Sequence, residues 1–241
     1  MIRLILVALT LLLYLILGIP VLLIEWLISR WNPRFRDISC LRMVQAAFKL
    51  ILWFTGADVT YIGKENIPED QAVLYVSNHN SYFDILLTYS QCPGLTGYVA
   101  KAEMLRYPLL RDWMKRLYCL FLDRTDMRAG LQTILTGIDY IKNGISICIF
   151  PEGTRSKDGK MQPFKEGSLK MASKTGCPIV PIAITGSAEI LENHFPRVKP
   201  CKVIVEYGTP IYPKKLSREE QKFPGAYTQQ KIQEMLDRHH L

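Results

Sequence analysis

A histidine and an aspartate five residues apart, in the segment 78–84, are the strongest candidates for acid–base chemistry in this sequence. The segment follows an apolar, β-branched run at 72–76 and precedes a helix-like run at 85–89. His79 could accept a proton, and Asp84 could fix the tautomer of the imidazole and stabilise its charge. Five residues along a regular helix correspond to about 140° of rotation, so the two side chains meet only if His79 lies in the loop and Asp84 in the first turn. The alternative is a capped helix start with a surface histidine.

A second polar segment, with the sequence FPEGTRS, occupies residues 150–156 and follows another apolar, strand-like run at 145–150. Its glycine, Gly153, allows close approach of the backbone to a ligand. Its arginine, Arg155, offers a planar fork of donors that suits a phosphate group. The segment therefore indicates a site for a phosphorylated ligand.

Together these two segments resemble the glycerolipid acyltransferases, and specifically the 1-acylglycerol-3-phosphate acyltransferases. Members of this family carry four short motifs, which occur here in order and with fitting spacing between residues 72 and 186. They are N-H-x-S-x-x-D at Asn78–Asp84, an acidic residue followed by arginine at Asp123-Arg124, F-P-E-G-T-R-S at Phe150–Ser156, and V-P-[IV] at Val180–Ile182. The H-x4-D pair alone is a weak signal, whereas the intact heptapeptide is a strong one and all four motifs in order are stronger still.

The resemblance implies transfer of an acyl chain from acyl-CoA or acyl carrier protein (ACP) to the sn-2 hydroxyl of 1-acyl-sn-glycerol 3-phosphate. The product would be phosphatidic acid, an intermediate of phospholipid biosynthesis. His79 would be the general base and Asp84 the residue that orients it. Two alternatives remain open: a different acceptor, either another lysophospholipid or glycerol 3-phosphate, and a non-catalytic membrane scaffold that binds lipid.

The resemblance also assigns residues that bind the acceptor in the third motif. Arg155 is expected to hold the acceptor phosphate, with the Thr154 hydroxyl and the Gly153 amide as further donors. A carboxylate beside a phosphate would repel it, so Glu152 is expected to orient Arg155 or to accept from a glycerol hydroxyl. The alternative for Glu152 is a salt bridge with a neighbouring cation.

Two further cations are expected near the phosphate. Arg124 matches the second motif, and its alternative is a surface ion pair with Asp123 or Asp126. Lys101 follows a strand and resembles a basic position that family members keep beside the acceptor, although a solvated lysine is an equally good interpretation.

This chemistry is expected to need no protein nucleophile, because the acceptor hydroxyl can attack the thioester directly. Consistent with this, the sequence contains no G-x-S-x-G elbow. Histidines outside the first motif lack metal-ligand spacing with any cysteine or acidic residue. We therefore expect no cofactor and no metal, with the acyl thioester acting as a substrate.

Composition limits the partners of the chain. Its 241 residues carry a formal net charge of +8, which suits an anionic bilayer surface or phosphorylated substrates. Nucleic acid is not expected, because no recognition motif accompanies the charge. The six cysteines are scattered and never form C-x-x-C, which is typical of a reduced, cytoplasmic domain.

The first part of the chain is expected to anchor it to a membrane. Residues 4–24 form a run of 21 without a charged side chain, long enough to cross a bilayer, although Gly18 and Pro20 could kink it. The run is too long for the core of a signal peptide and no small-residue cleavage site follows. Arginines follow the run, at Arg30, Arg34, Arg36 and Arg42, so the rest of the chain is expected on the cytoplasmic face.

A second apolar stretch, 41–54, places Arg42, Gln45 and Lys49 on one narrow stripe at helical spacing. It is expected to be an amphipathic helix in the membrane interface. Packing of the same helix on the soluble domain is the alternative. With either interpretation, residues 1–56 are expected to form the membrane anchor.

From residue 57 to residue 241 strand-like and helix-like runs alternate, which predicts an α/β domain with a central mixed sheet flanked by helices. The expected strands are 59–62, 73–76, 97–100, 117–122, 145–150, 179–184 and 203–207. The expected helices are 85–90, 107–116, 129–142, 165–174 and 218–238.

Overall fold

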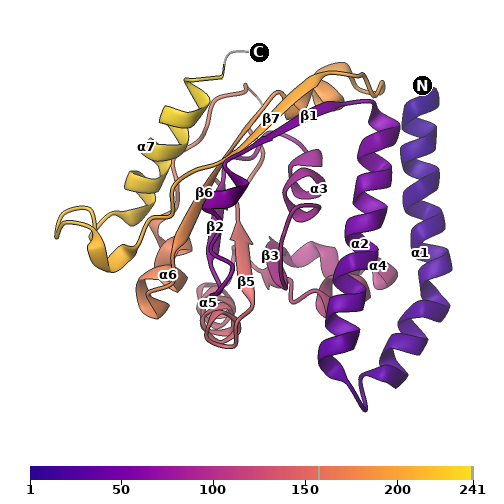
Figure 1. Cartoon of the computed structure of the whole chain (residues 1–241), viewed down its shortest axis with the longest axis horizontal. Helices are drawn as coiled ribbons and strands as arrows, with labels where there is room; N and C mark the ends of the chain where they lie inside the picture. Colours follow the sequence, from indigo (N-terminus) through magenta and orange to yellow (C-terminus); the bar gives the residue numbers. More distant parts are fainter. Residues whose placement is uncertain (157, 240–241) are drawn as a thin grey trace.

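A seven-stranded mixed sheet forms the centre of the protein in a computed structural model, which describes residues 1–156 and 158–239 (Figure 1). The strand order is β1-β7-β6-β2-β5-β3-β4, and only the β6–β7 pairing is antiparallel. The strands are β1 (Asp58–Ile62), β2 (Leu74–Ser77), β3 (Thr96–Lys101), β4 (Leu120–Leu122), β5 (Ser146–Ile149), β6 (Ile179–Thr185) and β7 (Lys202–Tyr207). The predicted mixed α/β fold is therefore confirmed, although the last two residues of the predicted domain lie outside the described part of the chain.

Helices cover both faces of the sheet (Figure 1). They are α1 (Ile2–Ile28), α2 (Pro33–Thr55), α3 (Phe83–Tyr89), α4 (Pro108–Arg116), α5 (Met127–Lys142), α6 (Lys170–Thr175) and α7 (Pro224–Leu236). Successive residues of a strand point to opposite faces. In β2, accordingly, Tyr75 packs with α2, α3 and α4 in one core, whereas Leu74 and Val76 pack with α5, α6 and α7 in the other. Burial on both faces explains why the central strands are continuous apolar runs.

Helices α1 and α2 form an antiparallel hairpin at one side of the molecule (Figure 1). Both are long and apolar enough to cross a membrane by length and composition. In the apolar stretch of α1 6% of the residues are buried, whereas 39% of those of α2 are. Helix α1 contacts α4 through Gly18, where a Cβ atom would lie only 3.0 Å from the Trp113 ring. The exposed apolar surface of the hairpin fits membrane association.

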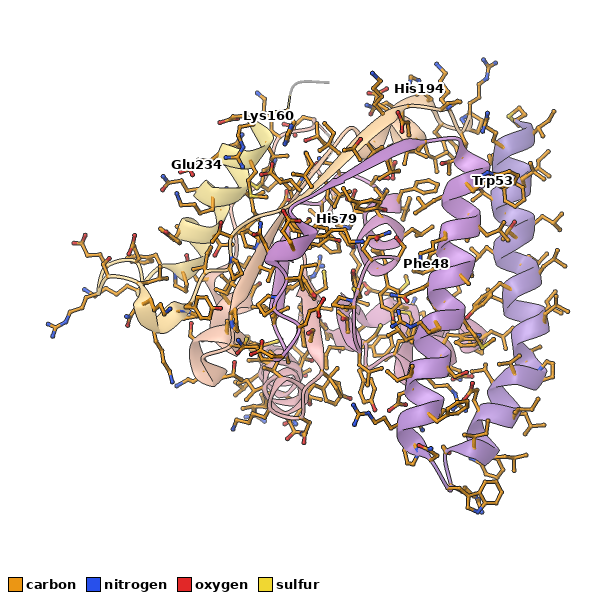
Figure 2. All side chains as sticks on the ribbon, viewed as in Figure 1. Phe48, Trp53, His79, Lys160, His194 and Glu234 are labelled. Carbon is orange, nitrogen blue, oxygen red and sulfur yellow. The ribbon has the colours of Figure 1, made fainter. Side chains whose placement is uncertain are left out.

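The polar stripe on α2 does not face solvent along its length. Gln45 is buried, and its Nε2 donates to the carbonyls of Tyr89, at 3.1 Å, and Cys92, at 2.8 Å, at the end of α3. Phe48, on α2 (Figure 2), also packs edge-on against Tyr89. On the outer surface of α2, by contrast, Trp53 is 71% exposed (Figure 2). The stripe thus joins the hairpin to the α/β part. The domain boundary after residue 56 stays a prediction.

Three predicted elements of the α/β part begin three or more residues later than predicted. Strand β4 begins at Leu120, three residues late, because Tyr118 has a positive φ of 58° that interrupts an extended chain. The predicted helix 165–174 begins as a 3₁₀ turn and becomes helical only from Lys170. The predicted helix 218–238 begins at Pro224, whose fixed φ suits the first turn of a helix.

We expect Gln45→Leu to lower the free energy of unfolding by about 1–3 kcal/mol, because two buried carbonyls lose their donor. Chemical denaturation in detergent would measure it. Lys49→Leu, one turn further along the same helix at an exposed position, is the matched control and should change little. Equal stability of Gln45→Leu and the wild-type protein would show that these contacts do not hold the hairpin.

Candidate active site

Four neighbouring parallel strands bring the polar motifs to one edge of the sheet. Strands β2, β5, β3 and β4 are adjacent and run in the same direction, so their carboxyl ends lie side by side. His79 follows β2, Glu152 follows β5, Lys101 ends β3, and Arg124 follows β4. This edge is where open α/β sheets bind ligands.

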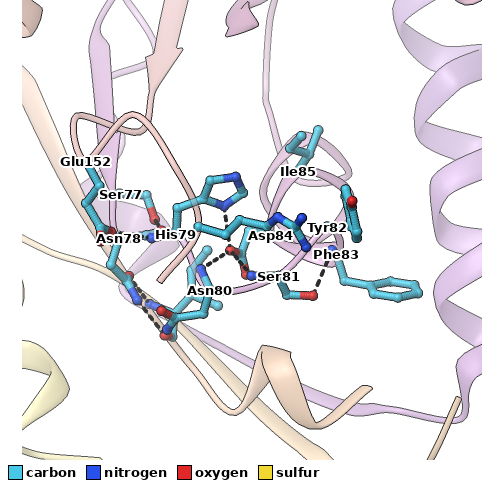
Figure 3. Close-up of polar contacts among 12 residues, drawn as sticks. Ser77, Asn78, His79, Asn80, Ser81, Tyr82, Phe83, Asp84, Ile85 and Glu152 are labelled. Carbon is cyan, nitrogen blue, oxygen red and sulfur yellow. Dashed lines mark hydrogen bonds and ion pairs between the residues drawn. The ribbon is translucent and has the colours of Figure 1, made fainter. Parts of the chain in front are cut away.

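His79 and Asp84 meet at the start of α3 (Figure 3). Asp84 lies in the first turn of the helix and His79 in the loop before it, and the distance from His79 Nδ1 to Asp84 Oδ2 is 2.8 Å. The same carboxylate oxygen accepts from the backbone amides of Asn80, at 2.7 Å, and Ser81, at 2.8 Å. Three donors converging on one buried oxygen hold the carboxylate, and therefore the imidazole, in one orientation.

The geometry decides where the imidazole carries its proton. A carboxylate can only accept, so Nδ1 of His79 is the donor and Nε2 of the neutral ring has a free lone pair. The ring stacks on Phe150 with 4.1 Å between centroids, and the side chain is 15% exposed. An imidazole that is oriented, partly exposed and unprotonated at Nε2 is suited to accept a proton from a substrate hydroxyl.

Among the described residues, Glu152 contacts backbone amides rather than Arg155 or a neighbouring cation. One carboxylate oxygen accepts from the His79 amide at 2.7 Å (Figure 3), and the other accepts from the Gln162 amide at 2.8 Å. The side chain is 5% exposed, and burial raises the pKa of the carboxyl above its ordinary value. Glu152 therefore joins the loop after β5 to the loop that carries His79, and its predicted role in acceptor binding stays a prediction.

Two more contacts fix the loop around His79. The Asn78 side chain accepts from the Ile184 amide at 2.8 Å and donates to the Ile184 carbonyl at 2.9 Å. The His79 carbonyl accepts from the Ser156 amide at 2.8 Å. The loop after β2 is thus attached to β6 on one side and to the FPEGTRS segment on the other.

Lys101 and Arg124 line a cavity of about 330 Å³ at the ends of β3 and β4. Arg106 also lines it, together with the carboxylates of Glu103 and Asp123. The Asp123 carboxylate accepts from the Thr125 amide and hydroxyl, at 2.8 and 2.7 Å, rather than from Arg124. The cavity therefore carries an excess of positive charge and suits an anionic group.

Gly153 joins this cavity to the FPEGTRS segment. Its φ is +78°, and a Cβ atom there would lie 3.1 Å from Lys165 Nζ and 3.6 Å from Arg124 Cζ. The glycine thus allows two cations to approach the backbone closely. Lys165 was not predicted as a site residue, and no feature of the sequence distinguishes it from the other lysines.

Arg155 and Thr154 line a different cavity, of about 480 Å³, together with Asn80 and Glu192. Arg155 Nη1 lies 3.1 Å from a Glu192 carboxylate oxygen, and the guanidinium lies 3.5 Å from the centre of the Tyr82 ring. The two arginines predicted to hold one phosphate are therefore separated into two cavities. The sequence did not predict Glu192, because only the fold brings this residue to the first motif, and it did not predict the contact of Tyr82 with Arg155.

Within residues 1–156 and 158–239, no cluster of three or more His, Cys, Asp or Glu side chains could hold a metal ion. The residues described at this edge of the sheet supply a general base, backbone amides and cations.

Known proteins resemble this chain in sequence. A probable 1-acyl-sn-glycerol-3-phosphate acyltransferase of Mycoplasma pneumoniae is 34% identical over 227 residues, which cover 84% of this chain and 83% of that protein. The 1-acyl-sn-glycerol-3-phosphate acyltransferase of Cocos nucifera is 35% identical over 168 residues. That match covers 68% of this chain but 53% of the relative, so the chain spans about half the length of this and similar curated relatives.

The fold also has a solved counterpart. The crystal structure of the 1-acyl-sn-glycerophosphate (LPA) acyltransferase PlsC from Thermotoga maritima matches with a TM-score of 0.78 and 26% sequence identity. The match covers 98% of this chain and 95% of that one. In addition, the sequence model of the family described as Acyltransferase matches residues 58–185, more than half of the chain and the part that contains all four motifs. The chain therefore belongs to the acyltransferase family.

Proposed function

We propose that the protein transfers an acyl chain from a thioester donor, acyl-CoA or acyl-ACP, to the sn-2 hydroxyl of 1-acyl-sn-glycerol 3-phosphate. The product is phosphatidic acid, for phospholipid biosynthesis. The observation that carries this proposal is the 2.8 Å contact between His79 and the buried Asp84 at the sheet edge. The names of the relatives in Mycoplasma pneumoniae, Cocos nucifera and Thermotoga maritima support the choice of acceptor.

In the proposed reaction, the sn-2 hydroxyl oxygen attacks the thioester carbonyl while His79 Nε2 takes the hydroxyl proton. The positive charge that develops on the imidazole is stabilised by the Asp84 carboxylate. Collapse of the tetrahedral intermediate breaks the carbon–sulfur bond, and the leaving thiolate takes the proton from the imidazolium. The donor is a substrate, so the reaction uses no cofactor and no metal.

The acceptor phosphate is assigned to the cavity of Lys101 and Arg124, with Lys165 beside it. Its excess of cations supports this assignment, since a phosphate close to neutral pH carries one to two negative charges. Arg155, Thr154 and the Gly153 amide are proposed to contact the acceptor from the neighbouring cavity. The glycerol between these groups then presents its hydroxyl to His79.

The membrane hairpin fits this function, because the acceptor and the product both reside in a bilayer. An enzyme held at the surface can act on them without extracting either one. We propose the cytoplasmic face for the α/β part, on the basis of the arginines that follow the first apolar run and the six free cysteines.

Two other functions are distinguished by experiment. An acyltransferase for another lysophospholipid or for glycerol 3-phosphate would use the same general base. An assay in which these acceptors compete with lysophosphatidate therefore identifies the preferred acceptor. A non-catalytic lipid-binding scaffold would bind lysophosphatidate and transfer nothing from either donor. The intact, oriented pair of His79 and Asp84 favours an enzyme over the scaffold.

We expect His79→Ala to lower acyl transfer at least ~100-fold, the scale of losing a general base. The assay would use purified protein in mixed micelles with lysophosphatidate and either acyl-CoA or acyl-ACP. Asp84→Asn should lower kcat about tenfold or more, because an amide oxygen can still accept the three donors while the negative charge is lost. His194→Ala, whose ring contacts Glu189 and neither motif, is the matched control. Equal turnover by His79→Ala and the wild type would remove His79 as the base.

We expect Arg124→Gln to raise KM for lysophosphatidate by about 10- to 100-fold, the loss expected for one charge-assisted contact to phosphate. KM for the acyl donor should not change. Arg128→Gln, in the first turn of α5 and absent from the cavity lining, provides the control. If Arg124→Gln changed KM for the donor but not KM for the acceptor, the cavity would be assigned to binding of the acyl donor.

A further inference from the structure

Glu192 lies far from the motifs in sequence, yet it binds two of them at once. It belongs to a short 3₁₀ segment, Glu192–His194, that follows β6. One carboxylate oxygen accepts from the Tyr82 amide at 2.7 Å and from Arg155 Nη1 at 3.1 Å. The other accepts from the Ser81 hydroxyl at 2.8 Å. None of these four residues gives or takes a proton in the proposed reaction.

On the side of the first motif, Glu192 stabilises the turn that opens α3. Tyr82 is the residue before the helix, and its backbone amide, which has no acceptor within the helix, donates to Glu192. Ser81, the other partner, supplies one of the backbone amides that hold Asp84. A carboxylate at this end of a helix is also electrostatically favourable.

On the side of the third motif, Glu192 limits where the Arg155 guanidinium can lie. The guanidinium contacts Glu192 through one nitrogen and rests on the Tyr82 ring at 3.5 Å. An arginine fork has five N–H donors, so donors remain for a ligand while the plane of the group is fixed. With 20% of the Glu192 side chain exposed, the ion pair is partly shielded from water and less weakened than a surface pair.

Glu152, the carboxylate of the same motif, is engaged by backbone amides rather than by Arg155. Both Glu152 oxygens already accept from backbone amides, those of His79 and Gln162. The residue that contacts the arginine comes instead from another part of the chain.

We propose that Glu192 is a positioning residue for acyl transfer, which holds Arg155 on the Tyr82 ring and aligns it with the turn that carries His79 and Asp84. This proposal rests on the proposed function. Because one carboxylate contacts both motifs, loss of its charge releases Arg155 and loosens the turn together. Misplacement of a positioning group by about 1 Å can cost on the order of 100-fold in rate.

The test is a double-mutant cycle of Glu192→Gln and Arg155→Lys, with KM for lysophosphatidate, KM for the donor and kcat measured for each protein. Glu192→Gln should lower kcat/KM for the acceptor by about 10- to 100-fold and leave the donor KM unchanged. If Glu192 acts through Arg155, adding Glu192→Gln to Arg155→Lys should cost far less than it does alone. Tyr82→Leu, which removes the ring under the guanidinium, should resemble Glu192→Gln.

Glu189→Gln is the matched control, because Glu189 lies three residues earlier and pairs with Asn193 and His194 rather than with either motif. Equal effects of Glu192→Gln and Glu189→Gln, or strictly additive effects of Glu192→Gln and Arg155→Lys, would overturn the proposal. Failure of the wild type to use lysophosphatidate would count against the proposed function alone. In that case the same cycle is measured in free energies of unfolding, where no coupling between Glu192 and Arg155 would overturn the positioning role.

Discussion

The convergence of three donors on one oxygen of Asp84 is the interaction on which the site depends. A carboxylate buried without solvent is costly unless it is hydrogen-bonded, and here His79 and the amides of Asn80 and Ser81 supply those bonds. Those amides can reach the carboxylate only if the chain turns sharply before α3. The neighbouring contacts, from Asn78 to β6, from Glu152 to the His79 amide and from Glu192 to Tyr82, all hold that turn.

The arrangement separates two electrostatic environments around the base. On the side of β3 and β4, Lys101, Arg106 and Arg124 leave an excess of positive charge. On the side of β6, Arg155 is neutralised by Glu192 within a cavity that also contains Asp158. A doubly charged headgroup is therefore favoured on one side of His79 and not on the other. That asymmetry would orient a phosphorylated acceptor before any contact with its acyl chain is made.

Much of this site is local in sequence, which explains how far the sequence alone could predict it. The His79–Asp84 pair needs only a strand, a loop and a first helical turn, and apolar runs predicted all seven strands. The contacts of Glu192 and Lys165 could not be predicted, because they depend on how distant segments meet at the sheet edge. The stripe on α2 had the periodicity of a solvent-facing surface, and periodicity cannot distinguish water from the buried carbonyls at the end of α3.

The Asn78 side chain has a consequence for how the sheet ends. The last backbone pair of the β2–β6 ladder is Ser77 and Ile182. Beyond it, the side-chain carboxamide of Asn78 accepts from the Ile184 amide and donates to the Ile184 carbonyl. The side chain thus substitutes for a peptide unit and forms one additional rung of the ladder. The main chain of the same residue is released from the sheet and can turn at once towards His79. An aspartate would keep the acceptor but lose the donor, so only a carboxamide imitates a peptide in this position.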